Sequence, residues 1–151
     1  MIRNILIVLL ILFLAFQFIR PARNNGAASS EKDIAHYVRV PDTVMSILKN
    51  SCYDCHSNHT NYPWYTNLNP AGLWMRQHVI YGKKAINFSD LSGFTKKKIV
   101  HRLGDIVEQI QKREMPLPSY TFIHRGASLD SGQIRLLKTW TDSARKELAA
   151  Q

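Results

Sequence analysis

Cysteine is scarce in this chain of 151 residues, in which Cys52 and Cys55 are the only two. Acidic residues are also few, with 11 Asp and Glu against 20 Lys and Arg, so the formal net charge is +9. The alternating pattern of a half-buried β-strand is scarce, and repeats and low-complexity tracts are absent. The chain has no Ser/His/Asp set, phosphate-binding loop or paired carboxylates, which excludes the common enzyme patterns built on them. Its length allows one domain with one core.

The basic residues form no stripe interleaved with stacking aromatic side chains. Lys96-Lys97-Lys98 is the only run, and we expect it to begin a solvated helix. Nucleic-acid binding is therefore not expected. A basic face could instead lie near anionic lipid or attract an acidic redox partner.

Polar residues are absent from Ile5 to Phe16, so this stretch is not an amphipathic helix of a soluble domain. About 15 to 18 helical residues reach most of a hydrocarbon core of roughly 30 Å. A cleaved signal peptide needs small residues soon afterwards, but the nearest cluster, Gly26-Ala27-Ala28, lies far downstream. We therefore expect residues 1–20 to be a transmembrane signal anchor, with a signal peptide as the alternative, and residues 21–35 to be a linker with little that could pack.

Helical spacing of apolar residues recurs in residues 36–151 and predicts an all-α domain of about four helices. Start signals occur at Pro41-Asp42-Thr43, at Asn69-Pro70, near Thr95, and at Asp130 with Gln133. We expect Gly82 to end the second helix, and the third to end near Lys112, before Met115-Pro116-Leu117-Pro118. The predicted inward faces are Val44, Ile47, Leu48 and Cys52; Leu73, Trp74, His78 and Tyr81; Ile99, Leu103, Ile106, Val107 and Ile110; and Ile134, Leu137, Trp140, Thr141, Ala144 and Leu148.

Cys52-Tyr53-Asp54-Cys55-His56 is the one motif with a specific chemical interpretation. Two thiols three residues apart lie one helical turn from each other and can add to the two vinyl groups on one edge of a haem. The next residue, His56, then projects its imidazole toward the iron. The spacing predicts one covalently attached c-type haem on Cys52 and Cys55, with His56 as an axial ligand.

Zinc and a redox-active dithiol are the alternatives for the same two cysteines. Zinc could take Cys52, Cys55 and His59, with His36 or another histidine as the fourth ligand, although the usual spacing to a second ligand pair is absent. A disulfide or thioredoxin-like pair would need a βαβ setting, which the sequence does not indicate. We favour haem over both.

Met115 is our first choice for a second axial ligand of the iron. It follows a helix, and Pro116 prevents the chain from folding back into that helix. A thioether favours the ferrous state and raises the reduction potential relative to a second imidazole. The alternatives are a methionine that only packs on the haem, and ligation by His78 from the second helix.

Asn61-Tyr62-Pro63-Trp64-Tyr65 is unusually aromatic for a loop and follows the cysteine motif closely. Trp64 and Tyr65 could form part of the haem wall and exclude water. The alternative is an ordinary role in the core of a small domain.

Several segments, taken in order, resemble a known family. They are Cys-Tyr-Asp-Cys-His-Ser-Asn at 52–58, Tyr-Pro-Trp-Tyr at 62–65, Asn87-Phe88-Ser89 and Glu114-Met115-Pro116. From about Val44 to Trp140 the chain resembles the bacterial haem-binding domain family of small cytochrome c-like envelope proteins. The resemblance implies a cytochrome c-like helical domain with haem on Cys52, Cys55 and His56. The Met-Pro pair also resembles the sixth-ligand segment of class I cytochromes c, but Lys112-Arg113-Glu114 stands where a glycine-containing turn is expected.

The function we expect is that of a membrane-anchored monohaem cytochrome that passes single electrons to redox partner proteins. Thioether formation in bacteria occurs outside the cytoplasmic membrane, so we expect a single-pass protein with its haem domain on the periplasmic side. One alternative is a peroxidase-like haem enzyme with an open distal face. The other is a haem-based sensor or an accessory domain of a larger envelope complex.

Overall fold

The structure is a computed structural model that describes residues 1–150. In this part of the chain the regular elements are all helical, apart from an isolated bridge between Asn25 and His59. The all-α prediction is therefore confirmed. The α-helices are α1 Ile2–Phe16, α2 Asp42–Ser51, α3 Tyr53–His56, α4 Ala71–Ala85, α5 Lys96–Gln111, α6 Pro118–Ile123 and α7 Ser131–Ala150, and the 3₁₀ helices are η1 Ile34–His36, η2 Trp64–Asn67 and η3 Arg125–Ala127.

Two of the predicted helix starts have the expected caps. At the start of α7 the Gln133 amide N–H donates to Asp130 Oδ1 at 2.8 Å, and the Asp130 N–H donates to Gln133 Oε1 at 2.9 Å. This is a reciprocal capping box. At the start of α5 the Thr95 hydroxyl accepts from the Lys98 N–H at 3.3 Å.

The predicted start and end of α4 are wrong. The first helical residue is Ala71, and Asn69 makes no cap. Its side-chain amide donates instead to the carbonyls of Phe16, at 3.0 Å, and Ile19, at 2.6 Å. The helix continues through Gly82 to Ala85, because Gly82 packs against a neighbouring element and does not serve as a C-cap.

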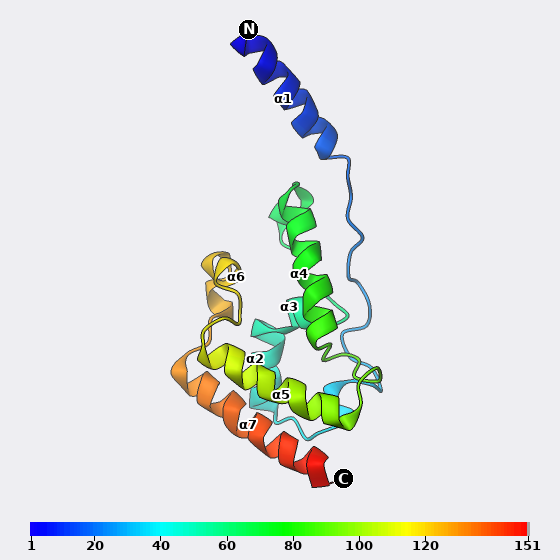
Figure 1. The fold of residues 1–151 in the computed structure, drawn as a ribbon, viewed down its shortest axis with the longest axis vertical. Coiled ribbons are helices and arrows are strands. Elements are labelled where there is room, and N and C mark those ends of the chain that lie inside the picture. Colours follow the sequence, from blue (N-terminus) through cyan, green and yellow to red (C-terminus); the bar gives the residue numbers. More distant parts are fainter. Residues whose placement is uncertain (151) are drawn as a thin grey trace.

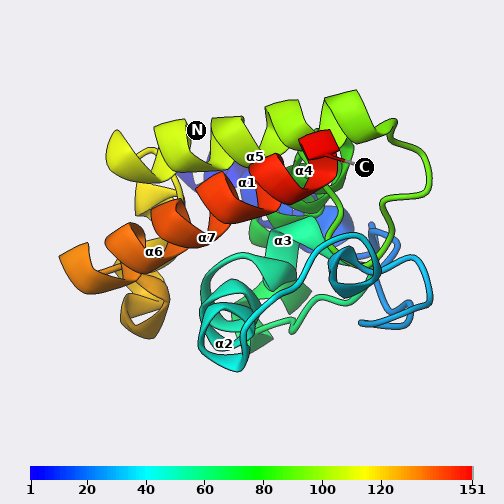
Figure 2. The same ribbon diagram turned by 90° about the horizontal axis from the view of Figure 1, so that it is seen from below.

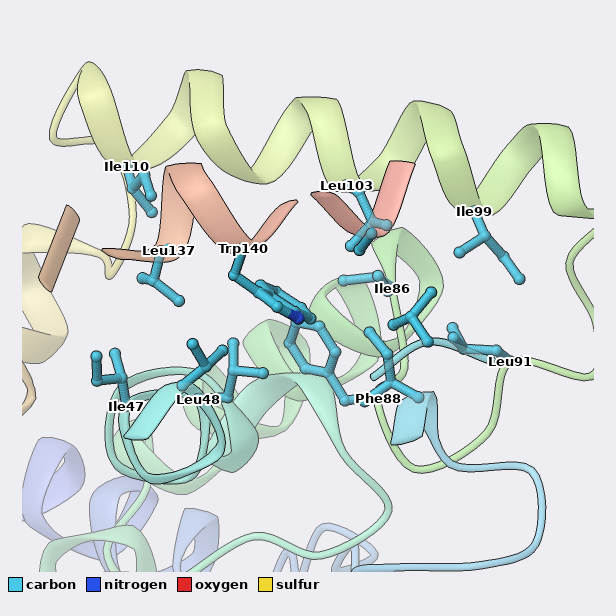
Figure 3. Close-up of a cluster of buried hydrophobic side chains, with 14 of the residues drawn as sticks. Ile47, Leu48, Ile86, Phe88, Leu91, Ile99, Leu103, Ile110, Leu137 and Trp140 are labelled. Carbon is cyan, nitrogen blue, oxygen red and sulfur yellow. The ribbon is translucent and has the colours of Figure 1, made fainter. Parts of the chain in front are cut away.

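The core lies where α5 and α7 meet α2 and the segment 86–91 (Figure 3). The helices α5 and α7 run side by side in opposite directions (Figure 2), and Trp140 of α7 lies between the α5 side chains and those of α2. The Trp140 indole N–H donates to the Arg39 carbonyl at 3.0 Å. The predicted inward faces of α2, α5 and α7 are largely confirmed, with Leu48, Leu103 and Leu137 fully buried.

The predicted face of α4 is wrong. The buried residues of α4 are Gly72, Met75, Val79 and Gly82, whereas Trp74 is 42% and Tyr81 is 62% exposed. Part of this side of α4, including His78 and Tyr81, faces a cavity.

The N-terminal helix α1 projects away from the other helices at one end of the molecule (Figure 1). Its 15 residues correspond to about 22 Å at ~1.5 Å per residue. Among residues 1–150, no helix is both long enough and apolar enough to cross a membrane, which corrects the expectation of a transmembrane helix. The base of α1 is hydrogen-bonded to the domain, because Gln17 exchanges bonds with the backbone of Asn69 and Arg20 donates to the Asn67 carbonyl.

The segment expected to be a linker packs against the domain. Asn24 donates to the Ser57 carbonyl at 2.9 Å and to the Thr60 hydroxyl at 3.0 Å, and it accepts from Lys83 at 2.8 Å. Further on, Ile34 is fully buried in the core. Short polar side chains bond to the irregular loops they cross, a kind of packing that apolar periodicity does not reveal.

Candidate haem site

The two cysteines lie on one helical turn, as their spacing predicts. Cys52 connects α2 to α3, and its carbonyl accepts from the N–H groups of Cys55, at 3.2 Å, and His56, at 2.9 Å. Both thiols are free and partly buried. This arrangement places two sulfur atoms and an imidazole next to one another.

Two cavities meet at this turn. The first, of about 340 Å³, lies between α3, α4 and the segment from Met115 to Tyr120. The second, of about 280 Å³, lies between α4, α5 and Phe88. Four residues line both cavities: Cys52, His56, Ala85 and Met115. The structure therefore brings His56 and Met115 to one shared space beside the cysteines.

The His56 imidazole is oriented by a bond to the backbone. Its Nδ1 lies 3.1 Å from the Ile86 carbonyl oxygen, which can only accept, so Nδ1 carries the proton and Nε2 has its lone pair free. The His56 carbonyl in turn accepts from the Phe88 N–H at 2.7 Å. Burial lowers the pKa of His56 below its ordinary value and favours the neutral ring that a metal requires.

A glycine permits the close packing of α4 on this motif. A Cβ atom at Gly82 would lie 2.5 Å from the Cys55 carbonyl oxygen and 3.1 Å from the Cys55 Cβ. The first distance is shorter than Cβ contacts in real proteins, so a side chain at this position would push the two elements apart. Gly82 thereby holds α4 against α3 and also sets the position of Ile86, four residues later.

Met115 is placed by a tight turn after α5. The N–H groups of Glu114 and Met115 both donate to the Gln109 carbonyl, at 3.0 and 3.3 Å. Arg113 adopts the left-handed conformation, with φ of 60°. The structure therefore forms the turn without the glycine expected there, and the Arg113 guanidinium donates to the Leu129 carbonyl at 2.6 Å.

Asp54, within the cysteine motif, connects α3 to α6. Its Oδ2 accepts from the Tyr120 hydroxyl at 2.6 Å, and its Oδ1 accepts from the backbone N–H of Asn61 at 3.1 Å. Burial and this bond raise the pKa of Tyr120. The Tyr120 ring also stacks on His124, with centroids 4.4 Å apart. Sequence reasoning missed this connection, because α6 is short and begins at Pro118.

The acidity of the thiols does not resemble that of a reactive dithiol. Burial, with the neighbouring Cys55, raises the pKa of Cys52 to about 12, and burial with Asp54 raises the pKa of Cys55 to about 11. Redox-active Cys-x-x-Cys pairs have a lowered thiol pKa. Within residues 1–150 no three His, Cys, Asp or Glu side chains converge as metal ligands, so the alternative zinc set with His59 does not assemble.

The remaining candidate residues are divided between the cavity and the surface. His78 lines the first cavity only, and its Nδ1 lies 2.8 Å from the Trp74 carbonyl. Trp64 is 76% exposed and lines neither cavity. Tyr65 is partly buried and bonds to His124 at 2.7 Å, and it also lies outside both cavity walls.

Residues 11–143 match the haem-binding domain family. The chain belongs to this family. Comparison of the haem-binding domain with curated proteins and with solved structures gives no match.

The side chains at the two cavities fit a haem. The haem-binding domain offers two free thiols on one turn, an imidazole with a free Nε2 and, across the second cavity, the apolar side chains of Ile86, Phe88 and Ile106. An apolar surround suits the flat hydrophobic face of a porphyrin. It also explains why Ile106, predicted as core, is only partly buried by protein.

Proposed function

We propose that this haem-binding domain is a monohaem c-type cytochrome-like protein that passes single electrons. Cys52 and Cys55 would carry the haem through thioether bonds, and His56 and Met115 would be the axial ligands. When bound, the haem supplies a one-electron redox change at its iron. The observation that carries the proposal is that Cys52, His56 and Met115 line both cavities.

The protein groups perform three tasks in this proposal. The bond from His56 to the Ile86 carbonyl orients the imidazole and increases its strength as a ligand. The Gln109 carbonyl fixes the turn that carries Met115. The apolar residues limit water, which favours the reduced state. If His56 and Met115 both hold the iron, no coordination site would be left open, which is why we propose electron transfer and not a peroxidase reaction.

Location outside the cytoplasmic membrane is part of the proposal. Thioether attachment in bacteria takes place there, and the exposed apolar helix α1 is suited to directing export. A reporter enzyme fused after Gln151 should be active only outside the cytoplasm. Activity confined to the cytoplasm would contradict this location.

Covalent attachment is tested first. Coexpression with haem-maturation machinery should give a haem-stained band that survives denaturing electrophoresis, with a mass one haem above that of the chain. The double variant Cys52→Ala/Cys55→Ala should lose this band. An unmodified wild-type mass under the same conditions would contradict attachment.

The axial ligands are tested by optical and EPR spectra of both oxidation states. Wild type should be low-spin, with the methionine-to-iron band at the red end of the oxidised spectrum. Met115→Ala should abolish this band, lower the potential and allow cyanide or carbon monoxide to bind. Met115→His should stay low-spin at a lower potential.

His78→Ala is the matched control, because His78 also lines the first cavity. It should leave the spectra nearly unchanged. If His78→Ala becomes high-spin while Met115→Ala is unaffected, the sixth iron ligand is His78 of α4 and not Met115. A high-spin wild type that consumes peroxide would favour an enzyme.

A further inference from the structure

Arg102 on α5 has a buried donor that nothing in the described chain satisfies. Its Nη1 donates to Asp105 Oδ2 at 2.9 Å, and its side chain is 36% exposed. Its Nε is buried and has no hydrogen-bond partner among residues 1–150. A buried N–H without a partner is unfavourable, and native structures rarely leave one.

This arginine lies in the wall of the second cavity, close to apolar residues such as Ile106. Among the residues that line the two cavities, Arg102 is the only Lys or Arg. Asp105 and Glu108 line the same wall and supply negative charge. The wall therefore combines one guanidinium, held by a carboxylate at Nη1, with apolar side chains such as Phe88 and Ile106.

We propose that Arg102 binds a propionate carboxylate of the haem. The proposal rests on haem occupying the cavities as proposed above. A carboxylate supplies acceptor oxygens, and guanidinium binds it through two parallel N–H groups. If the haem is attached at Cys52 and Cys55, its opposite edge, which carries the propionates, would lie toward α5. Asp105 would then be a positioning residue that holds the Arg102 guanidinium at the cavity wall through its bond to Nη1.

Arg145 on α7 provides a matched control within the same helix pair. Its Nε is also buried without a partner among the described residues. Its guanidinium carbon, however, packs on Gly104, 3.5 Å from the position that a Cβ of residue 104 would occupy. Arg145 lines neither cavity. Arg145→Gln removes the same charge and the same kind of donor without touching the cavity.

The experiment compares holoproteins of wild type, Arg102→Gln, Arg102→Lys and Arg145→Gln by redox titration and resonance Raman spectroscopy. Arg102→Gln should lower the reduction potential, because a propionate without its cation favours ferric iron. It should also shift the propionate bending band. Arg102→Lys keeps the charge, so it should shift the band with a smaller change in potential. Equal, small effects of Arg102→Gln and Arg145→Gln would overturn the proposal.

A binding assay keeps the two proposals distinguishable. If the wild type carries no covalent haem, the proposed thioether attachment is wrong. The role of Arg102 is then tested separately, by adding haem to the purified proteins. Arg102→Gln should raise the dissociation constant for haem several-fold, while Arg145→Gln should not. Equal dissociation constants in variants with unchanged circular dichroism would overturn the role of Arg102 alone.

Discussion

Replacing Gly82 by alanine should separate α4 from the cysteine motif. The added Cβ would lie 2.5 Å from the Cys55 carbonyl oxygen, so the helices must move about 0.9 Å apart to reach the ordinary contact distance of 3.4 Å. Both clashing groups belong to backbone segments, and no rotamer change relieves the contact. We expect a cost near the upper end of the ~1–3 kcal/mol typical of overpacking. Alanine returns about 1 kcal/mol in helix propensity, which leaves a net loss of about 2 kcal/mol.

Gly104→Ala is the matched control, because Gly104 also lies inside a helix. A Cβ there would meet Arg145 at 3.5 Å, an ordinary contact, so this variant should gain about 0.5–1 kcal/mol. The two variants should differ by about 2.5–3 kcal/mol in chemical denaturation followed by circular dichroism. Gly82→Ala should also reduce the yield of covalent haem, because movement of α4 displaces the Ile86 carbonyl from His56. Equal stabilities would refute the close packing of α4 on Cys55.

Three further substitutions test other contacts by denaturation or hydrogen exchange. Arg113→Gly should be more stable than Arg113→Ala by about 1 kcal/mol, because both lose the bond to Leu129 but only glycine avoids the left-handed penalty. Tyr120→Phe should speed amide exchange in α6 and cost about 1–2 kcal/mol, since its bond to the Asp54 carboxylate is lost; an unchanged exchange rate would contradict that anchoring role. Asp130→Ala should cost about 1 kcal/mol through loss of the capping box, and a neutral effect would reject it.

Local signals in the sequence predicted much of the helical framework. The capping pair of Asp130 and Gln133 and the cap at Thr95 depend on residues three positions apart, so the sequence carries all the information needed. The regular apolar spacing of α5 and α7 likewise predicted most of the buried face of each helix. The cysteine turn was predictable for the same reason, since Cys52, Cys55 and His56 are fixed by one helical turn.

Features that depend on distant residues or on the cavity could not be predicted in this way. The apolar pattern of Trp74 and Tyr81 is typical of a core face, yet this side of α4 meets a cavity and solvent. Asn69 has the ordinary pattern of a helix cap, but it bonds to carbonyls more than forty residues earlier in the chain. No short-range pattern indicates that Gly82 meets Cys55 or that Arg102 lacks a partner for Nε.

The packing of Asn24 has a consequence for proteolysis. A cut at the small residues Gly26–Ala28 would detach Asn24, which takes part in five hydrogen bonds, to Ser57, Tyr62 and Lys83 and twice to Thr60. A protease acting on the folded protein would first have to open this segment, at a free-energy cost that slows cleavage. A peptidase acting before folding would meet no such resistance, but the domain left behind would lack the side chain that joins these loops.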